Sequence, residues 1–367
     1  MTENMLPGRR RALVLSGGLA LGAYQAGACE ALLREEGAPA HIAATSVGAV
    51  NAVLIAGCRD GDPAAALRAF WRGAAGWPLP FWQEMAGWRQ GIGIADALQS
   101  QAWGRPGLFR RRLMPEAGGV PGLHDLTPLR DRLAELVDFG RIAAGGIRLS
   151  LSATDLASGE RVVFDTARGD TIGPEQVAAS SALVPLFAPL EIDGRWLGDG
   201  ALSANTPLDL VLDAEPDQDL LCFLVDLFAP DGQVPRSLGA GLSRSLDLVF
   251  GNQTRALLQA RQRDAALRAV IARMGEAVPA TLRDEPALHG LLAEGHTARH
   301  LLLSLGFHAG PQEIGVGKLM DYSAAALRER WQGGAAQMRA ALRLAAAPPA
   351  GAQEPGLTVL DVPPEAA

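Results

Sequence analysis

The stretch that decides the fold is His41–Asn51, with the sequence HIAATSVGAVN. Its first part, His41–Thr45, predicts a short apolar strand, and Val47–Gly57 predicts an apolar helix. Ser46 stands on the turn between them, where the helix points its N-terminus at the hydroxyl. This strand–turn–helix context is typical of a nucleophilic serine. It is also the pattern of an ordinary helix N-cap, so these residues alone leave both interpretations open.

Two small residues flank Ser46 at a distance of two positions, Ala44 before it and Gly48 after it. The turn is crowded and needs small side chains at both places. The usual elbow pattern is G-x-S-x-G, so Ala44 departs from it by one methyl group. Catalysis at Ser46 therefore depends on whether the rest of the chain supplies an oxyanion hole and a base.

Composition and charge restrict the class of protein. The chain has 367 residues, 48% of them hydrophobic, which suits one large or two modest domains with a substantial core. A net charge of −7 argues against general nucleic-acid binding. The three cysteines are scattered and show no metal-ligand spacing, which suits a reducing compartment. His296 and His300, four residues apart, could share a helix face, but two exposed polar residues explain this spacing better than a metal site. We expect no metal and no cofactor.

The start of the chain shows no secretory signal. Met1–Arg11 is polar, and the apolar run Ala12–Leu15 is too short for a signal peptide. No window approaches the roughly 18–20 apolar residues that a membrane span needs. We therefore expect a soluble cytoplasmic protein.

Apolar runs and helical patterns alternate along the chain, which indicates an α/β layered domain with buried parallel strands. Residues 74–123 contain Trp, Arg, Pro and Gly, and predict a long insertion with little regular structure. This insertion is either a lid that touches lipid headgroups or a loop that buries its aromatic side chains. Residues 311–345 predict a helical extension, and the Pro- and Ala-rich residues 346–367 predict a disordered tail. Residues 1–10 form a short lead, so the main domain covers residues 11–310.

A glycine-rich turn follows the first predicted strand, at Gly17, Gly18 and Leu19. Backbone N–H groups at such a strand-to-helix turn form an anion site, which can hold a phosphate or stabilise an oxyanion. The glycine spacing does not fit a dinucleotide fingerprint well, because Leu19 stands where a glycine is needed, and no P-loop Gly-Lys follows. A tight turn that simply needs small residues explains the pattern equally well.

An acid lies between two glycines just past a later strand, in Gly198-Asp199-Gly200-Ala201. This position projects Asp199 into a cleft, although a plain Asp-Gly turn gives the same pattern. No histidine stands in a comparable loop, so a Ser46–Asp199 dyad is the simplest catalytic arrangement. Burial raises the pKa of a carboxyl and makes it a better base toward a hydroxyl.

Taken together, these motifs resemble the patatin-like phospholipases. The glycine-rich loop, the elbow Ala44–Gly48 and the base motif Asp199-Gly200-Ala201 are similar to the family's three motifs. Further similar stretches extend the resemblance to roughly residues 10–340, and two of them point to a bacterial subgroup with a C-terminal helical extension. These stretches are residues 152–160, 179–185, 205–207, 67–71 and 321–331.

The resemblance implies a three-layer α/β/α sandwich that carries a patatin-like acyl hydrolase domain over residues 11–310. It implies metal-free hydrolysis of lipid acyl esters through an acyl-enzyme, with Ser46 as nucleophile, Asp199 as proton acceptor and Gly17–Leu19 as the oxyanion loop. Besides Ala44 and Leu19, Leu21 departs from the family pattern, because many members have Arg or Lys there.

Other functions remain open at this stage. The same dyad could serve a short-chain esterase, a thioesterase or an intracellular polyester depolymerase. A non-catalytic lipid-binding protein could keep the fold, and a nucleotide-binding protein fits the motifs least well. The arginines at 9–11 and 110–112 are the best candidates for peripheral contact with the inner face of a membrane.

Overall fold

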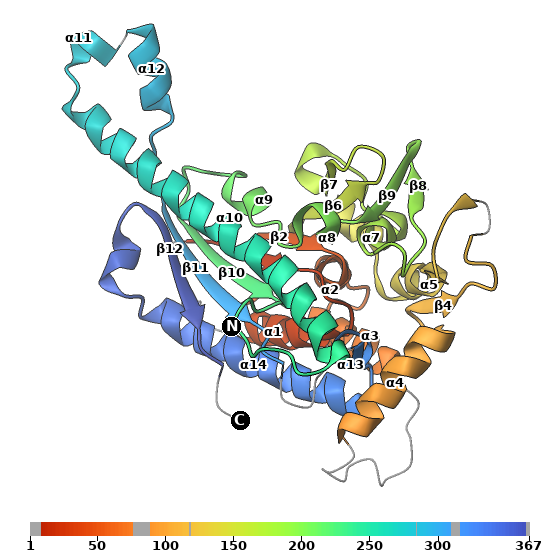
Figure 1. Cartoon of the computed structure of the whole chain (residues 1–367). Coiled ribbons are helices and arrows are strands. Elements are labelled where there is room, and N and C mark those ends of the chain that lie inside the picture. The colour runs from red at the N-terminus through yellow and green to blue at the C-terminus, as the bar shows by residue number, and fades with distance from the viewer. Residues whose placement is uncertain (1–8, 76–88, 117–118, 284, 310–315, 365–367) are drawn as a thin grey trace.

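The computed structural model describes residues 9–75, 89–116, 119–283, 285–309 and 316–364 (Figure 1). A nine-stranded sheet runs through it in the order β12-β11-β10-β1-β2-β6-β9-β8, with β7 also paired to β6. From β12 to β6 all neighbours are parallel, whereas β7, β8 and β9 pair in antiparallel fashion. The strands are β1 (Arg10–Leu15), β2 (His41–Thr45), β6 (Arg148–Asp155), β7 (Arg161–Asp165), β8 (Leu190–Ile192), β9 (Arg195–Asp199), β10 (Leu220–Asp226), β11 (Arg299–Gly306) and β12 (Gly356–Val362).

Helices cover both faces of the sheet. Because side chains alternate between the faces of a strand, Leu13 and Leu15 join the larger core and Ala12 and Val14 the smaller one. The larger core is closed by α1 (Gly22–Glu35), α2 (Val47–Ala56), α3 (Pro63–Ala74), α5 (Thr127–Leu136) and α14 (Ala324–Ala346), and the smaller by α9 (Asp209–Leu212) and α10 (Leu238–Ala277). The predicted three-layer α/β/α sandwich with a mostly parallel sheet is therefore confirmed.

The C-terminal helix α14 packs closely along α1. A Cβ atom on Gly27 would lie 2.0 Å from the carbonyl oxygen of Trp331, and one on Gly334 would lie 1.9 Å from that of Tyr24. Glycine at both positions lets the two backbones touch. The helical extension predicted at 311–345 therefore completes the same layer as the N-terminal part of the chain.

The expectation of little regular structure in residues 74–123 is wrong for the part of it that the structure describes. Helix α4 (Arg89–Trp103) and a small sheet of β3 (Gly104–Arg105), β4 (Phe109–Arg111) and β5 (His124–Asp125) lie there. Frequent Pro and Gly hid the elements, which are short apart from α4. Residues 76–88, with three of the tryptophans on which the lid idea rested, lie outside the described residues.

The expectation of a disordered tail is also wrong. Residues 356–362 form β12, which pairs in parallel with β11 over seven residue pairs. Leu357 and Val359 pack against one core, while Leu360 and Val362 pack against the other. This alternation is the pattern of a strand, but its short length inside a Pro- and Ala-rich segment concealed it.

Helix α10 is continuous over 40 residues, with Gly251 at the point where it crosses the carbonyl oxygen of Phe228. Its last turns and the short helices α11 (Ala280–Arg283) and α12 (Pro286–Ala293) project from the body as an arm (Figure 1). Among the described helices none is long and apolar enough to cross a membrane.

Candidate active site

Ser46 lies at the C-terminal end of β2, directly before α2. Its backbone has φ 56° and ψ −125°, a strained conformation for a residue with a side chain. The turn is tight because α2 starts against β1, so that a Cβ atom on Gly48 would lie 2.4 Å from the carbonyl oxygen of Leu15. Ser46 occupies the N-cap position of α2, but its side chain makes no capping hydrogen bond. The N-cap interpretation of the hydroxyl is therefore wrong.

The hydroxyl of Ser46 is bound to Asp199, at the C-terminal end of β9. Ser46 Oγ donates a hydrogen bond of 2.6 Å to Asp199 Oδ2, and both side chains are buried. Asp199 Oδ1 accepts the backbone N–H of Ala201 at 2.8 Å. Burial raises the pKa of Asp199 to about 7, although these two hydrogen bonds act in the opposite direction. The structure thus brings together the serine and the acid that the sequence singled out.

Helix α7 (Pro174–Ser180) holds the two loops at a fixed separation. Ser180 Oγ accepts the backbone N–H of Ser46 at 2.9 Å, and the carbonyl oxygen of Ser180 accepts the N–H of Gly200 at 3.2 Å. Thr154 Oγ1 donates to the carbonyl oxygen of Asp199 at 2.9 Å. Neither Ser180 nor Thr154 was expected to have a role, because a serine or threonine in a regular element gives no signal of what it supports.

The glycine-rich loop lies against Ser46, since a Cβ atom on Gly17 would be 3.0 Å from Ser46 Cβ. The N–H of Gly17 donates to Asn205 Oδ1 at 3.1 Å, so it is engaged and does not face the site as predicted. For the N–H groups of Gly18 and Leu19 no partner is found among the described residues. These two N–H groups stand at the start of a short 3-10 helix, Leu19–Leu21, which leads into α1. The dipole of α1 favours a negative charge near its N-terminus.

Two of the three departures from the family pattern, Ala44 and Leu21, have structural explanations. Ala44 lies inside β2, where its φ is not positive, and its methyl group is buried in the larger core. Leu19 has φ 52°, in the left-handed region, so a side chain there is strained. Leu21 is fully buried in the larger core, a position where an uncompensated cation would be costly.

A narrow apolar cavity opens beside Ser46. Its volume is about 40 Å³, far below the roughly 300–1,000 Å³ of typical ligand sites, so it is too small to hold a typical ligand as it stands. Leu108 and Phe109 from the insertion form part of its wall, which supports the lid idea in position only. The other lining residues are Leu19, Val47, Val50, Phe70, Trp71, Leu126, Leu129, Ser181, Phe187 and Tyr322.

Buried polar contacts attach the insertion to the C-terminal part of the chain at this cavity. The N–H of Tyr322 donates to Asp96 Oδ2 of α4 at 2.7 Å, and Arg89 forms a 2.9 Å ion pair with Asp321. Arg105 pairs with Asp96 and also lies over the Tyr322 ring. These contacts therefore fix Tyr322 against the insertion.

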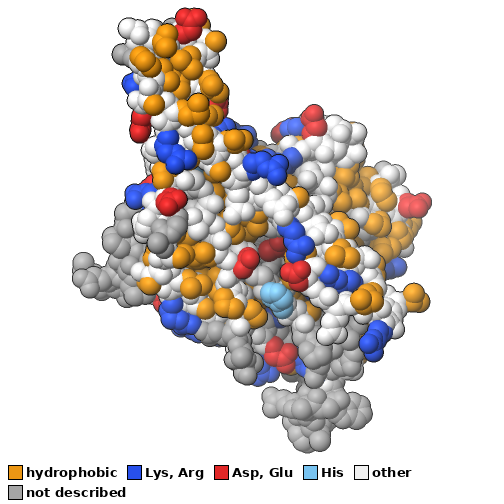
Figure 2. All heavy atoms as spheres, turned by 60° about the vertical axis from the view of Figure 1, so that its left-hand side comes forward, with side chains coloured by type: hydrophobic (Ala, Val, Ile, Leu, Met, Phe, Trp, Pro, Cys, Tyr) orange, Lys and Arg blue, Asp and Glu red, His pale blue; other side chains and the backbone are white. Residues whose placement is uncertain are grey.

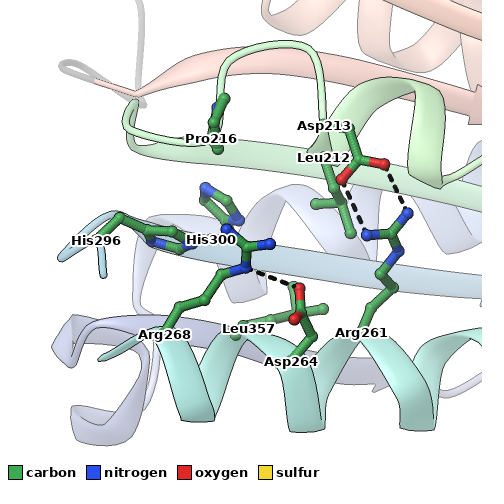
Figure 3. A pocket seen from close by; sticks show the side chains of 10 residues that line it. Leu212, Asp213, Pro216, Arg261, Asp264, Arg268, His296, His300 and Leu357 are labelled. Atoms are coloured by element: carbon green, nitrogen blue, oxygen red, sulfur yellow. Dashed lines mark hydrogen bonds and ion pairs between the residues drawn. The ribbon is translucent and has the colours of Figure 1, made fainter. Parts of the chain in front are cut away.

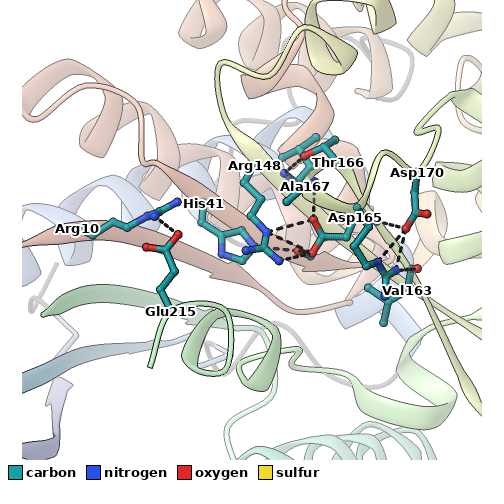
Figure 4. Close-up of polar contacts among 12 residues, drawn as sticks. Arg10, His41, Arg148, Val163, Asp165, Thr166, Ala167, Asp170 and Glu215 are labelled. Carbon is teal, nitrogen blue, oxygen red and sulfur yellow. Dashed lines mark hydrogen bonds and ion pairs between the residues drawn. The ribbon is translucent and has the colours of Figure 1, made fainter. Parts of the chain in front are cut away.

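The histidine nearest to Ser46 in sequence, His41, lies at the other end of β2, about 16 Å away by strand geometry. There His41 Nε2 contacts Ser150 Oγ at 2.8 Å, Ser150 donates to Asp165, and Arg148 binds the same carboxylate (Figure 4). Burial, with the charge of Arg148, lowers the pKa of His41 to about 4. This network is a neutral-histidine structural cluster and not part of the site.

His296 and His300 do not share a helix face, because His300 belongs to β11 and His296 precedes it. They line a cavity of about 230 Å³ with Arg261 and Arg268, at the opposite edge of the sheet from Ser46 (Figure 3). Among the described residues no group of three or more His, Cys, Asp or Glu could hold a metal ion.

The two arginine clusters lie at different edges of the sheet. Arg10 and Arg11 at the start of β1 pair with Glu215 and Glu36, at the edge away from Ser46. Arg110 and Arg111 follow the cavity wall, and Arg110 pairs with Asp125 at 2.8 Å. Only the second cluster is on the side of the candidate site.

Comparisons with known proteins identify the family. The family model described as "Patatin-like phospholipase" matches residues 13–212, which is more than half of the chain, and one described as "Patatin phospholipase" matches residues 248–349. A solved structure, VipD from Legionella pneumophila, matches with 14% identity over 89% of this chain and 67% of that one, but its TM-score of 0.33 is too low to carry an argument. The chain belongs to the patatin-like phospholipase family.

Proposed function

We propose that the chain hydrolyses acyl ester bonds of lipids, with Ser46 as the nucleophile and Asp199 as the proton acceptor. The observation that carries the proposal is the 2.6 Å hydrogen bond from Ser46 Oγ to a buried carboxylate whose pKa is raised to about 7. A base with a pKa near the working pH accepts a proton in the transition state and can return it afterwards.

In the first step the Ser46 proton moves to Asp199 Oδ2 while Oγ forms a bond to the ester carbonyl carbon. The negative charge then develops on the former carbonyl oxygen, for which the N–H groups of Gly18 and Leu19 are the proposed donors. Collapse of this intermediate breaks the ester C–O bond, and Asp199 gives its proton to the leaving alcohol. Water then attacks the acyl-Ser46 while Asp199 accepts its proton. Collapse of this second intermediate breaks the acyl bond to Ser46 Oγ, which regains the proton from Asp199, and releases the fatty acid.

The apolar lining of the cavity favours an acyl chain over a polar substrate. Because the cavity is too narrow for a long chain, we propose that the wall formed by Leu108 and Phe109 moves when substrate enters. The same dyad on short esters, thioesters or polyesters remains an alternative that differs in acyl length and leaving group.

The test is fatty-acid release from mixed micelles of phospholipid, compared with hydrolysis of a short-chain ester, for the wild type, Ser46→Ala and Phe109→Ala. We expect no release by Ser46→Ala, and a shift of preference toward longer acyl chains in Phe109→Ala because its wall recedes. Hydrolysis of the short ester alone, in wild type and Phe109→Ala alike, would favour the esterase alternative. Release by Ser46→Ala equal to that of the wild type would contradict the proposal.

A further inference from the structure

The outward face of α10 carries apolar side chains that the described residues leave uncovered. Leu242, Val249, Leu267, Val270 and Met274 are 40 to 62% exposed, although each is a residue that normally packs. Figure 2 shows hydrophobic side chains gathered on the projecting arm, to which the last three of these belong. The opposite face of α10 packs on the sheet through Leu257, Leu258 and Ala265.

These outward residues follow a coiled-coil spacing. Steps of four and three residues alternate along the helix through a single seam, which is the 3.5-residue period of two helices packed side by side. The period continues across five heptads of α10. All of its positions are apolar except Gln253 and Arg263. The seam consists of Leu242, Leu246, Val249, Gln253, Ala256, Ala260, Arg263, Leu267, Val270, Met274 and Ala277. Of these, Leu246 is half-buried because it also packs against the larger core of its own chain.

Two copies of the seam are complementary when they pack in antiparallel fashion. If a two-fold axis passes at the level of Leu258, two antiparallel copies of α10 bring every large apolar seam residue opposite another one. The alanines meet at the centre, where small side chains allow the closest approach, and the two polar residues face each other. The pairs are Leu242 with Met274, Leu246 with Val270, Val249 with Leu267, Ala256 with Ala260, and Gln253 with Arg263.

The charges beside the seam do not oppose this pairing. Next to the seam, only Asp264 and Arg273 are charged, and Asp264 is paired with Arg268 within its own chain. A low charge beside the seam is typical of an interface, whose core is depleted of charge.

The position of the arm argues against a membrane as the occupant. Helix α10 begins beyond the C-terminal end of β10, near the Ser46 side, and runs back along the sheet. At Ala265 it passes Gly356, the first residue of β12, so the remaining residues extend past the edge away from Ser46. An arm inserted in a bilayer would hold the candidate site at the far end of the molecule from its substrate.

We propose that α10 and its arm form an antiparallel, two-fold symmetric interface with a second copy of this chain. Closed two-fold dimers use the same surface patch on both subunits, which is what a self-matching seam provides. Pairing over about 32 residues gives a helix contact roughly 48 Å long and about 10 Å wide. The two subunits together then bury on the order of 1,000 Å², the lower limit of a specific interface. This area does not include any contact made by α11 and α12.

The first experiment measures the mass of the full chain by size exclusion with light scattering, at the highest concentration at which it stays soluble. We expect twice the chain mass of 38.4 kDa. Ala256→Glu, which places a carboxylate of each copy beside the axis, should give the single-chain mass with an unchanged circular dichroism spectrum. Gln262→Glu adds the same charge to an exposed position off the seam and should remain dimeric.

A second experiment fixes the register. Oxidation of the double variant Ala256→Cys/Ala260→Cys should give a covalent dimer, whereas Gln262→Cys should not. The inference is overturned by a wild type of single-chain mass, by a dimer that Ala256→Glu leaves intact, or by crosslinking that Gln262→Cys matches. Binding of a single-chain wild type to vesicles of phosphatidylcholine and phosphatidylglycerol would assign the seam to a membrane instead.

Discussion

Replacing Asp199 by asparagine should abolish hydrolysis and at the same time stabilise the fold at neutral and alkaline pH. The asparagine keeps the size of the side chain and the acceptor for the N–H of Ala201, but it removes the charge. The pKa of Asp199 is about 7 in the folded chain, against the ordinary value of 3.8 for an aspartate. At about 1.4 kcal/mol per pKa unit, the ionised carboxylate destabilises the fold by up to about 4 kcal/mol.

The sign of the effect follows from proton linkage. Below pH 3.8 the carboxyl is protonated in both the folded and the unfolded chain, so it imposes no penalty. The penalty grows as the pH rises from 3.8 to about 7 and is constant above that, because the group is then ionised in both states. Asparagine imitates the protonated form at every pH, so the advantage of the variant should grow as the pH rises.

Urea unfolding of wild type and Asp199→Asn at pH 4.5, 6 and 8.5 measures this difference directly. We expect the variant to be more stable by about 1 kcal/mol at the lowest pH and by about 2–4 kcal/mol at the highest. Asp60→Asn, on an exposed turn, is the matched control and should show no such trend. A variant that is no more stable than the wild type at pH 8.5, or a difference that does not change with pH, would refute the reasoning.

Three further substitutions test the surroundings of Ser46. Asn205→Ala leaves the buried N–H of Gly17 without its acceptor, so we expect a loss of about 1–3 kcal/mol in urea unfolding and a fall in kcat larger than the change in KM; an unchanged kcat would argue against a positioning role. Leu19→Gly removes the strain of a left-handed backbone, which costs about 1–2 kcal/mol, but it also makes the unfolded chain more flexible and removes a partly buried side chain. These effects oppose each other, so the free energy of unfolding should change by less than about 1 kcal/mol. A loss above about 2 kcal/mol would contradict the strain. Gly48→Ala should destabilise by about 2 kcal/mol or more, because its Cβ would overlap the Leu15 carbonyl, whereas Gly91→Ala in the exposed part of α4 should gain about 0.5–1 kcal/mol.

The positions of Ser46 and Asp199 could be predicted because strand ends are visible in sequence. A buried strand is a short apolar run, and parallel strands bring their C-terminal ends to one edge of the sheet. Ser46 follows such a run, but Asp199 ends β9, which pairs in antiparallel fashion with β6, so Asp199 was expected near Ser46 from its motif and not from this rule. The structure places the two side chains 2.6 Å apart. The three-layer fold follows from the same alternation of strands and helices.

The contacts that hold the site could not be predicted, because they join residues far apart in sequence. Asn205 lies 188 residues after Gly17, to which it is bound, and no local pattern distinguishes it from a turn residue. Gly17 was predicted as an oxyanion donor because its N–H group lies in the glycine-rich loop. The sequence cannot show that this N–H group is already hydrogen-bonded to Asn205. Ser180, which binds the backbone of Ser46, was missed for the same reason.

The elements that could not be predicted are short or lie in unusual composition. Strand β12 has only seven residues in a Pro- and Ala-rich segment, and its partner β11 lies 57 positions away along the register. Strands β3, β4 and β5 have two or three residues each, fewer than a periodic pattern needs to be recognised. Tertiary packing, such as Phe109 against Phe187 and His124, decides these segments, and local propensity does not.

The central claim is that Ser46 is a nucleophile activated by Asp199, and covalent labelling with a fluorophosphonate probe tests it most directly. Folded wild type, assayed with detergent present to open the cavity wall, should be labelled on Ser46. Ser46→Ala should not be labelled, and Asp199→Asn should be labelled much more slowly. Absence of labelling in the wild type, or labelling that survives in Ser46→Ala, would contradict the claim and favour a lipid-binding protein that keeps the fold without the chemistry.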